Sequence, residues 1–255
     1  MKRFAAGLTA VLLVTGNVRA EALDEEAIAQ EEESPAVAVE LAVDVYSAYV
    51  WRGITYNDGF VVQPSLDVEL PNGFGVNVWA NYDLDDYNNQ IDKDEFSELD
   101  VTVRYTLPVD FAEIVLGVVQ YTFPQAGGPD DSDTIEWFAS ASYDVMEGLS
   151  CGLEVAYDSD QVKDLYAKVS LTYEMDLMDG LSGEMSASAG YAGDEWSASG
   201  DPGFFDYSFG VALAYSITDS ASLGASAVWV GALDDDVLAD VDERFFYGCN
   251  LACGF

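Results

Sequence analysis

Apolar and polar residues alternate with a period of two along most of the chain, which predicts an all-β fold. About twelve such segments follow one another, and an even number of antiparallel strands can close into a barrel. The connections alternate between short turns and longer loops rich in Asp, Asn and Gly. The sequence therefore predicts a single closed antiparallel transmembrane β-barrel of about 12 strands, preceded by a cleaved signal peptide.

Residues 1–20 have the features of a signal peptide. Lys2 and Arg3 precede an apolar run over residues 4–14, and Val18-Arg19-Ala20 fits a small-residue cleavage site. The run is shorter than the roughly 20 apolar residues of a membrane-spanning helix. We expect the mature chain to begin near residue 21. Residues 21–35 then form an acidic spacer, for which a solvated tether is favoured over a functional plug.

The barrel is predicted over residues 36–255. The first strand places Val37, Val39, Leu41, Val43, Val45, Tyr49 and Trp51 on one face and Glu40, Asp44 and Arg52 on the other. Further strands are expected at 60–70, 74–84, 98–107, 112–123, 134–143, 149–158, 164–175, 181–192, 204–215, 221–231 and 244–255. Short turns are expected near 71–73, 108–110, 144–148, 176–180 and 216–220, and longer loops at 53–59, 85–94, 124–133, 159–163, 193–203 and 232–243.

Aromatic residues near the strand ends favour a membrane barrel over a soluble β-sandwich, which explains the alternation equally well. The apolar face carries Tyr82, Tyr105, Tyr121, Tyr143, Tyr157, Tyr173, Tyr191, Tyr215 and Trp229 at such positions, where interfacial aromatic girdles lie. The last strand is apolar at every second residue and ends on Phe255, which is typical of strands that the barrel assembly machinery of Gram-negative outer membranes recognises. We expect the outer membrane as the location and its lipid and lipopolysaccharide as partners.

Charge and composition exclude several classes of function. The chain has 47 Asp and Glu against 9 Lys and Arg, a formal charge of −38, so nucleic-acid binding is excluded. It has no His, which removes Ser-His-Asp and Cys-His catalysis and histidine metal sites. No pair of acids stands out as a glycosidase pair. We therefore expect no enzyme activity, no catalytic residues, no cofactor and no metal.

Several motifs bear on the family. Tyr49-Val50-Trp51-Arg52-Gly53-Ile54 is followed by Gln63-Pro64-Ser65, Asn72-Gly73-Phe74, Trp79, Glu98-Leu99-Asp100 and the segment over residues 117–124. This set, with the Trp-Arg-Gly segment as its specific part, resembles the family of proposed porins called TorF or Gcw_chp. The resemblance implies an outer-membrane barrel with a pore and supplies neither a substrate nor a catalytic motif.

If the apolar face contacts lipid, the polar face lines the lumen. The predicted pore-lining residues are Glu40, Asp44, Arg52, Asp67, Glu69, Trp79, Asp83, Glu98, Asp100, Arg104, Glu136, Glu154, Lys168 and Glu174. Because carboxylates predominate, a conducting lumen should prefer cationic or neutral small solutes. The alternative is a plugged barrel, in which these groups pair with the few cations and the acidic loops serve a structural or surface-binding role.

Arg52 and Arg104 stand out because basic residues are so few. They could form an electrostatic constriction, but a role as counter-ions for Glu40, Asp44 or Asp100 is favoured. Trp79 could stack on a solute, although filling volume is the commoner role. The acidic loop clusters could bridge to lipopolysaccharide through divalent cations, with a solvated surface favoured; they are Asp85, Asp86, Asp92, Asp94, Asp130, Asp131, Asp133, Asp234, Asp235, Asp236, Asp240, Asp242 and Glu243.

The three cysteines are not expected to form a disulfide. Cys249 and Cys253 are four residues apart in one strand, roughly 13 Å, beyond the limit of about 7 Å between Cα atoms. Both are expected on the lipid face with Cys151, as small apolar residues.

Overall fold

The computed structural model describes residues 37–88, 91–125, 133–239, 241–242 and 244–255. The predicted signal peptide and acidic spacer lie outside these residues, as do Asp130, Asp131, Asp240 and Glu243 of the loop clusters. In the described part of the chain, no helix has the length and apolarity that a membrane span requires.

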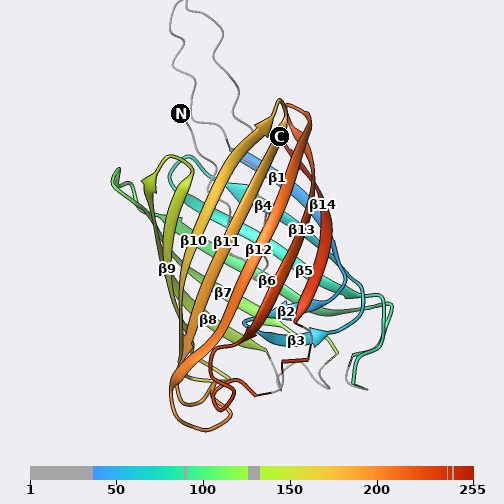
Figure 1. Ribbon diagram of the computed structural model, residues 1–255, viewed down its shortest axis with the longest axis vertical. Coiled ribbons are helices and arrows are strands. Elements are labelled where there is room, and N and C mark those ends of the chain that lie inside the picture. The colour runs from blue at the N-terminus through green and yellow to red at the C-terminus, as the bar shows by residue number, and fades with distance from the viewer. Residues whose placement is uncertain (1–36, 89–90, 126–132, 240, 243) are drawn as a thin grey trace, which may run out of the picture.

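The described chain forms a closed antiparallel barrel of twelve strands, which confirms the predicted fold (Figure 1). The strands are β1 (Ala38–Tyr46), β4 (Val61–Glu69), β5 (Phe74–Asp83), β6 (Glu95–Thr106), β7 (Glu113–Thr122), β8 (Thr134–Met146), β9 (Leu149–Asp158), β10 (Leu165–Met178), β11 (Leu181–Ala192), β12 (Gly203–Thr218), β13 (Ala221–Ala232) and β14 (Phe245–Gly254). Each strand pairs with its neighbours in sequence, and β1 pairs with β14 to close the barrel. Closure leaves no unpaired strand edge in this sheet.

The two ends of the barrel differ as predicted. At the end where the C-terminus lies, short turns join the strands, whereas the longer connections gather at the opposite end (Figure 1). Gly73, Gly148 and Gly180 have positive φ in three of the short turns, a conformation that glycine adopts without steric cost. For brevity we call these the short-turn end and the long-loop end.

Three strands run longer than the alternation predicted. β8, β10 and β12 continue to Met146, Met178 and Thr218, and in each case the register shifts by one residue just before the turn. A bulge at these positions lets the strand carry on into a two-residue turn, so the polar residues that suggested a loop are still paired.

The first predicted strand is wrong beyond Tyr46. The chain breaks at Ser47 and Ala48 and then forms a separate two-stranded sheet, β2 (Tyr49–Trp51) and β3 (Ile54–Asn57), which is not part of the barrel. Arg52 and Gly53 connect these strands with φ of 50° and 74°. Two successive residues with positive φ form the tight turn typical of β-hairpins, so the chain reverses where a straight strand was expected.

The outward face of the barrel is apolar, with aromatic residues near both ends. At the long-loop end, rings pack in pairs between adjacent strands: Tyr82 with Phe96, Tyr191 with Phe204, and Trp229 with Phe245. At the short-turn end, Phe74 packs against Tyr105. Between the two bands the exposed side chains are aliphatic, including Val101, Val103, Leu153, Val169, Leu171, Val211 and Leu213.

Candidate functional site: the barrel interior and its hairpin

The inward face of the strands is polar in one half of the barrel. Along β6, Glu98, Asp100 and Arg104 are buried, while Leu99 and Val103 between them are exposed on the outside. Opposite this wall, most inward positions of β11, β12 and β13 hold small residues, among them Ser186, Ser188, Gly210, Ala212, Ala214, Gly224 and Ser226, with Glu184 and Asp206 as acidic exceptions. Charged side chains therefore line most of the interior, and the small residues of β11, β12 and β13 leave the opposite wall less crowded.

All of the predicted pore-lining residues in the strands occupy inward positions, but their accessibility differs. Buried within the barrel are Asp44, Trp79, Asp83, Glu98, Asp100, Arg104 and Glu136; partly accessible are Asp67, Glu69, Glu154 and Lys168; exposed are Glu40 and Glu174, toward the short-turn end. Arg52 reaches the interior by a different route, because it lies on the hairpin.

The β2–β3 hairpin is packed inside the barrel at the long-loop end (Figure 1). Tyr49, Val50 and Trp51 are buried, and they join an apolar cluster that draws on strands from both halves of the chain. Its other buried members are Tyr46, Ala48, Val61, Trp79, Tyr166, Ala192, Phe205, Val228, Val230, Val237, Leu238, Val241 and Phe246. The largest apolar core of the described chain thus fills the interior under the loops.

Arg52, at the tip of the hairpin, is bound to the opposite wall. Its Nη1 and Nη2 donate to the two carboxylate oxygens of Glu136 at 2.7 and 2.9 Å, and its Nη2 lies 4.0 Å from Glu154. The guanidinium carbon is 4.1 Å from the ring centres of both Trp51 and Tyr166. Burial disfavours the charged guanidinium, but the Glu136 carboxylate outweighs this effect and raises the pKa of Arg52.

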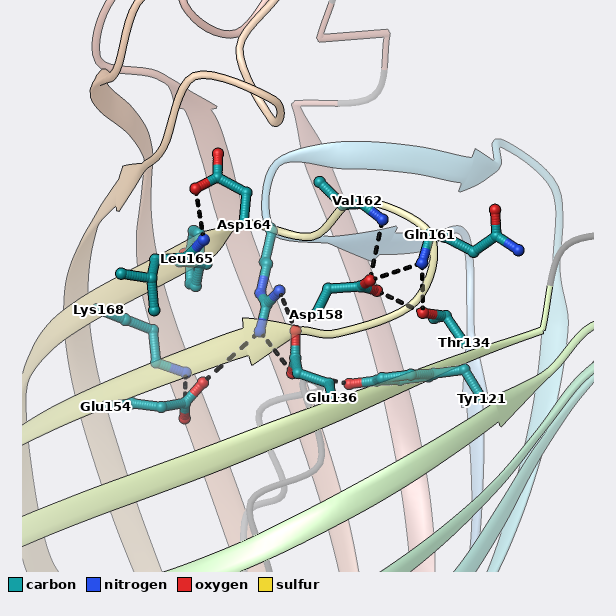
Figure 2. Close-up of polar contacts among 12 residues, drawn as sticks. Tyr121, Thr134, Glu136, Glu154, Asp158, Gln161, Val162, Asp164, Leu165 and Lys168 are labelled. Carbon is teal, nitrogen blue, oxygen red and sulfur yellow. Dashed lines mark hydrogen bonds and ion pairs between the residues drawn. The ribbon is translucent and has the colours of Figure 1, made fainter.

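Two further contacts extend this charged group along the wall (Figure 2). The ammonium of Lys168 lies 3.5 Å from Glu154, and the hydroxyl of Tyr121 donates to Glu136 at 3.2 Å. Tyr121 therefore faces the interior, and its predicted place in the outer aromatic girdle is wrong. Nearby, Asp158 closes the end of β9 by accepting hydrogen bonds from the Thr134 hydroxyl at 2.7 Å and the Val162 amide at 2.9 Å. The loop after β9 is therefore tied to the same strand that carries Glu136.

Arg104 makes a second charged group near the short-turn end. Its two terminal nitrogens donate to Asp67 at 2.9 and 2.7 Å, and Nη2 also donates to Glu69 at 2.9 Å. Both arginines are thus paired with carboxylates, but Glu40, Asp44 and Asp100 are not their partners. Pairing across the intervening strand β5, and between the hairpin and a distant strand, decides the choice of carboxylate.

Tyrosines surround the carboxylates under the hairpin. The Tyr49 hydroxyl donates to Glu98 at 2.8 Å, and its ring centre is 5.6 Å from that of Trp79. Trp79 therefore packs in the interior cluster and fills volume there. Burial, together with the nearby Glu98 charge, raises the pKa of Tyr56, so this phenol stays neutral.

The sequence patterns did not single out a row of buried amides beside these carboxylates. Gln63 Nε2 donates to Asn81 Oδ1 at 2.9 Å, Asn81 Nδ2 donates to Asp83 at 3.0 Å, and Asn57 Nδ2 donates to the same Asp83 oxygen at 2.6 Å. The signal that could have found them is the position of Gln63 and Asn81, two amides on the inward, polar faces of β4 and β5.

Within the described ranges, no group of three or more His, Cys, Asp or Glu residues is placed to hold a metal ion. Cys151, Cys249 and Cys253 are free thiols.

Comparisons with known proteins agree with this architecture. The KdgM porin in complex with disordered oligogalacturonate superposes with a TM-score of 0.54 at 10% sequence identity, covering 86% of this chain and 99% of that chain. The COG4313 outer membrane channel from Pseudomonas putida F1 gives a TM-score of 0.54 at 14% identity, covering 91% of this chain and all of that one, 100%. At these identities the likeness shows the fold. No curated protein matches the chain.

The family model described as "Bacterial protein of unknown function (Gcw_chp)" matches residues 29–248. This range includes the hairpin with its Trp51-Arg52-Gly53 turn and all the strands up to the middle of β14. The chain therefore belongs to the Gcw_chp family of bacterial proteins, and its fold is the closed twelve-stranded barrel of outer-membrane porins.

Proposed function

We propose that the protein is a porin-like channel of a Gram-negative outer membrane, through which small cationic or neutral solutes diffuse passively. The proposal includes export by the cleaved signal over residues 1–20. The apolar outer face with aromatic rings near both ends supports the location, because tyrosine and tryptophan favour the two membrane interfaces. The COG4313 channel and the KdgM porin have the same fold.

The observation that carries the preference for cations is the excess of inward carboxylates. Arg52, Arg104 and Lys168 are already paired with acids in this interior. Asp44, Glu98 and Asp100 are buried on the same wall with no basic residue among their hydrogen-bond partners in the described chain. Fixed negative charge raises the local concentration of cations and repels anions.

The same reasoning separates this chain from the KdgM porin. That protein was crystallised with oligogalacturonate, a sugar polymer that carries a carboxylate on each unit. An acidic wall would repel such a polyanion. We therefore propose that this chain shares the barrel fold of the KdgM porin but does not take the same solute.

A second candidate function is a plugged barrel with a structural or surface-binding role. The apolar cluster around Trp51, Phe205 and Leu238 favours it, because packed side chains fill the interior at the long-loop end. Under this alternative the carboxylates serve the internal pairs described above, and the acidic loops contact lipopolysaccharide. We propose no catalytic role in either case.

Planar-bilayer recording of the refolded mature chain under a KCl gradient tests the channel. Insertion is first verified by heat-modifiable gel migration. Steady steps with a cation-selective reversal potential are expected, and Glu98→Gln should shift that potential toward zero, since the amide keeps the Tyr49 hydrogen bond without the charge. Asp219→Asn, in an exposed turn, is the matched control and should shift nothing. A folded, inserted and silent barrel would sink the channel and favour the plugged protein.

Assembly is a separate part of the proposal. β14 pairs with both β1 and β13, and Phe255 after it is 78% exposed. We propose that this terminal strand is the segment that the barrel assembly machinery binds. Deleting Phe255 should lower the amount of folded protein in the outer membrane of an expressing strain, whereas refolding of the same variant in detergent should be unchanged.

A further inference from the structure

Buried acceptor oxygens without a partner are concentrated on one wall of the interior. Within the described residues, such atoms on β1, β4, β5 and β6 are Asp44 Oδ1, Gln63 Oε1, Asn77 Oδ1, Asp83 Oδ2 and Asp100 Oδ1. Buried polar groups are nearly always hydrogen-bonded, so each of these oxygens calls for an explanation. All of them are acceptors, so each of these five atoms lacks a donor or a cation.

Two of the residues that carry these oxygens lie side by side. Asp44 on β1 and Gln63 on β4 are direct partners in the antiparallel register, which places their Cβ atoms about 5 Å apart. Both residues are almost fully buried, with 2% and 1% of their surface exposed. They lie one inward position from Tyr46 and Val61, which belong to the apolar cluster, so the pair is directly under that cluster.

The orientation of the Gln63 amide follows from its neighbours. Asn81 turns its NH₂ group toward Asp83, whose Oδ1 accepts at 3.0 Å. The Asn81 oxygen then faces Gln63, and accepts from the Gln63 NH₂ group at 2.9 Å. This chain of donors uses the Gln63 NH₂ group on the β5 side and leaves the Gln63 oxygen without a donor, on a residue whose register partner on the other side is Asp44.

Neighbouring side chains do not neutralise this pair. Arg52 is bound to Glu136 and Arg104 to Asp67, in both cases by two hydrogen bonds. On the other side of β1, the register partner of Asp44 is Asn250, an uncharged amide. The Asp44 carboxylate carries one negative charge and the Gln63 amide carries none. This single charge matches a monovalent cation better than a divalent one.

We propose that Asp44 Oδ1 and Gln63 Oε1 form an inward-facing binding site for a monovalent cation, either an alkali ion or the primary ammonium group of a solute. The proposal adds a binding site to the proposed channel, and it rests on the channel function because it takes the bound cation to be the permeating species. Binding itself requires only the folded barrel, so the two can fail separately.

Thallium(I), an anomalously scattering substitute for potassium, provides the test. Crystals of the refolded protein at pH 8 are soaked in thallium acetate, for the wild type, Asp44→Asn and the control Asp219→Asn. A peak in the anomalous difference map is expected between Asp44 and Gln63 in the wild type and the control. It should be lost in Asp44→Asn, because the new amide removes the charge and supplies the missing donor to Gln63.

The other outcomes are also informative. Three results would overturn the site. The thallium peak could persist in Asp44→Asn, the wild-type map could show only a water molecule there, or the two oxygens could lie within hydrogen-bond distance of each other and share a proton. Soaking with methylammonium, followed by loss of the thallium peak, distinguishes a site that also takes ammonium groups from one that takes alkali ions alone. If the barrel conducts ions but the crystals show no thallium peak, only the cation site is wrong. If the thallium peak is present but the barrel does not conduct, only the channel function is wrong.

Discussion

Arg52 and Glu136, 84 residues apart in the chain, are joined by two hydrogen bonds of 2.7 and 2.9 Å. Their side chains are 6% and 5% exposed, so the pair is removed from bulk water. One partner is at the tip of an interior hairpin and the other is in the barrel wall. Because an unpaired charge is costly in such a place, this pair should decide whether the hairpin stays in its position.

Replacing Arg52 with alanine should release the hairpin. The free energy of unfolding should fall by about 3–5 kcal/mol, since Glu136 is left buried without its counter-ion. Single-channel conductance should rise if the hairpin narrows the path. Arg244→Ala, which removes an exposed arginine before β14, is the matched control. Unchanged conductance in a demonstrably destabilised Arg52→Ala variant would show that the hairpin does not limit ion flow.

A double-mutant cycle isolates the pair itself. Arg52→Ala, Glu136→Ala and the double variant are compared by urea unfolding of the refolded barrel. We expect a coupling energy of about 1–3 kcal/mol, because each single change leaves one buried charge and the double change leaves none. Strictly additive losses would mean that the aromatic rings around Arg52 hold the guanidinium, and that Glu136 contributes nothing.

Gly53 is expected to tolerate no side chain. Its φ is +74°, and an added Cβ would lie 2.7 Å from Leu238 Cδ2 and 2.9 Å from Asp206 Cβ. Gly200 has nearly the same φ, +75°, but nothing within 4 Å. Gly53→Ala should therefore lose about 1–3 kcal/mol more than Gly200→Ala. Trypsin cleavage after Arg52, protected by burial in the wild type, provides a second measurement; equal stability and equal protection in both variants would contradict the packing described here.

Arg104 should moderate the acidity of the interior near the short-turn end. Arg104→Gln leaves Asp67 and Glu69 without their cation, so the ratio of K⁺ to Cl⁻ permeability should rise, by about twofold. The reversal potential in a KCl gradient gives this ratio. Lys93→Gln, at an exposed loop position, serves as the control and should leave the ratio unchanged. A shift toward anions would contradict this role of Arg104.

The loop contacts have their own pH dependence. The Tyr87 hydroxyl donates to Asp242 at 2.7 Å, and burial followed by this contact raises the pKa of Tyr87 to about 12. The contact should therefore be fully present below the ordinary tyrosine pKa of about 10 and be lost as the pH rises through 12. When tyrosinate absorbance is followed against pH, Tyr87→Phe should show one fewer group that titrates near the high end than the wild type does. Identical titration curves for the two proteins would contradict the contact.

The strands could be predicted because each one has a single apolar face. In β6, three exposed aliphatic residues alternate with Asp100, Thr102 and Arg104. A shift of the strand register by one residue would place these polar side chains on the apolar outer face. The hairpin could not be predicted in this way. Tyr49 and Trp51 keep the same alternation as Val43 and Val45, and the difference lies in the positive φ of Arg52, which alternation does not report.

The interior positions were predictable, whereas the contacts among them were not. The alternation of apolar and polar residues places Glu136 and Arg104 on the inner face of the barrel. It does not show that Arg52 pairs with Glu136 or that Arg104 pairs with Asp67. Those choices depend on the curvature and closure of the sheet, which bring together residues that are remote along the chain. The amides Gln63 and Asn81 were overlooked because uncharged polar residues are common on the inner faces of barrel strands.

Closure of the barrel also sets an order of events for folding. The interior cluster joins the two ends of the chain, since the ring of Tyr46 in β1 packs 6.0 Å from that of Phe246 in β14. The hairpin rests on Tyr166, Phe205 and Leu238, which the chain supplies much later. It can find these partners only after the seam between the first and last strands has formed, so its docking is a late and non-local step. A buried hairpin thus reports that assembly of the whole sheet is complete.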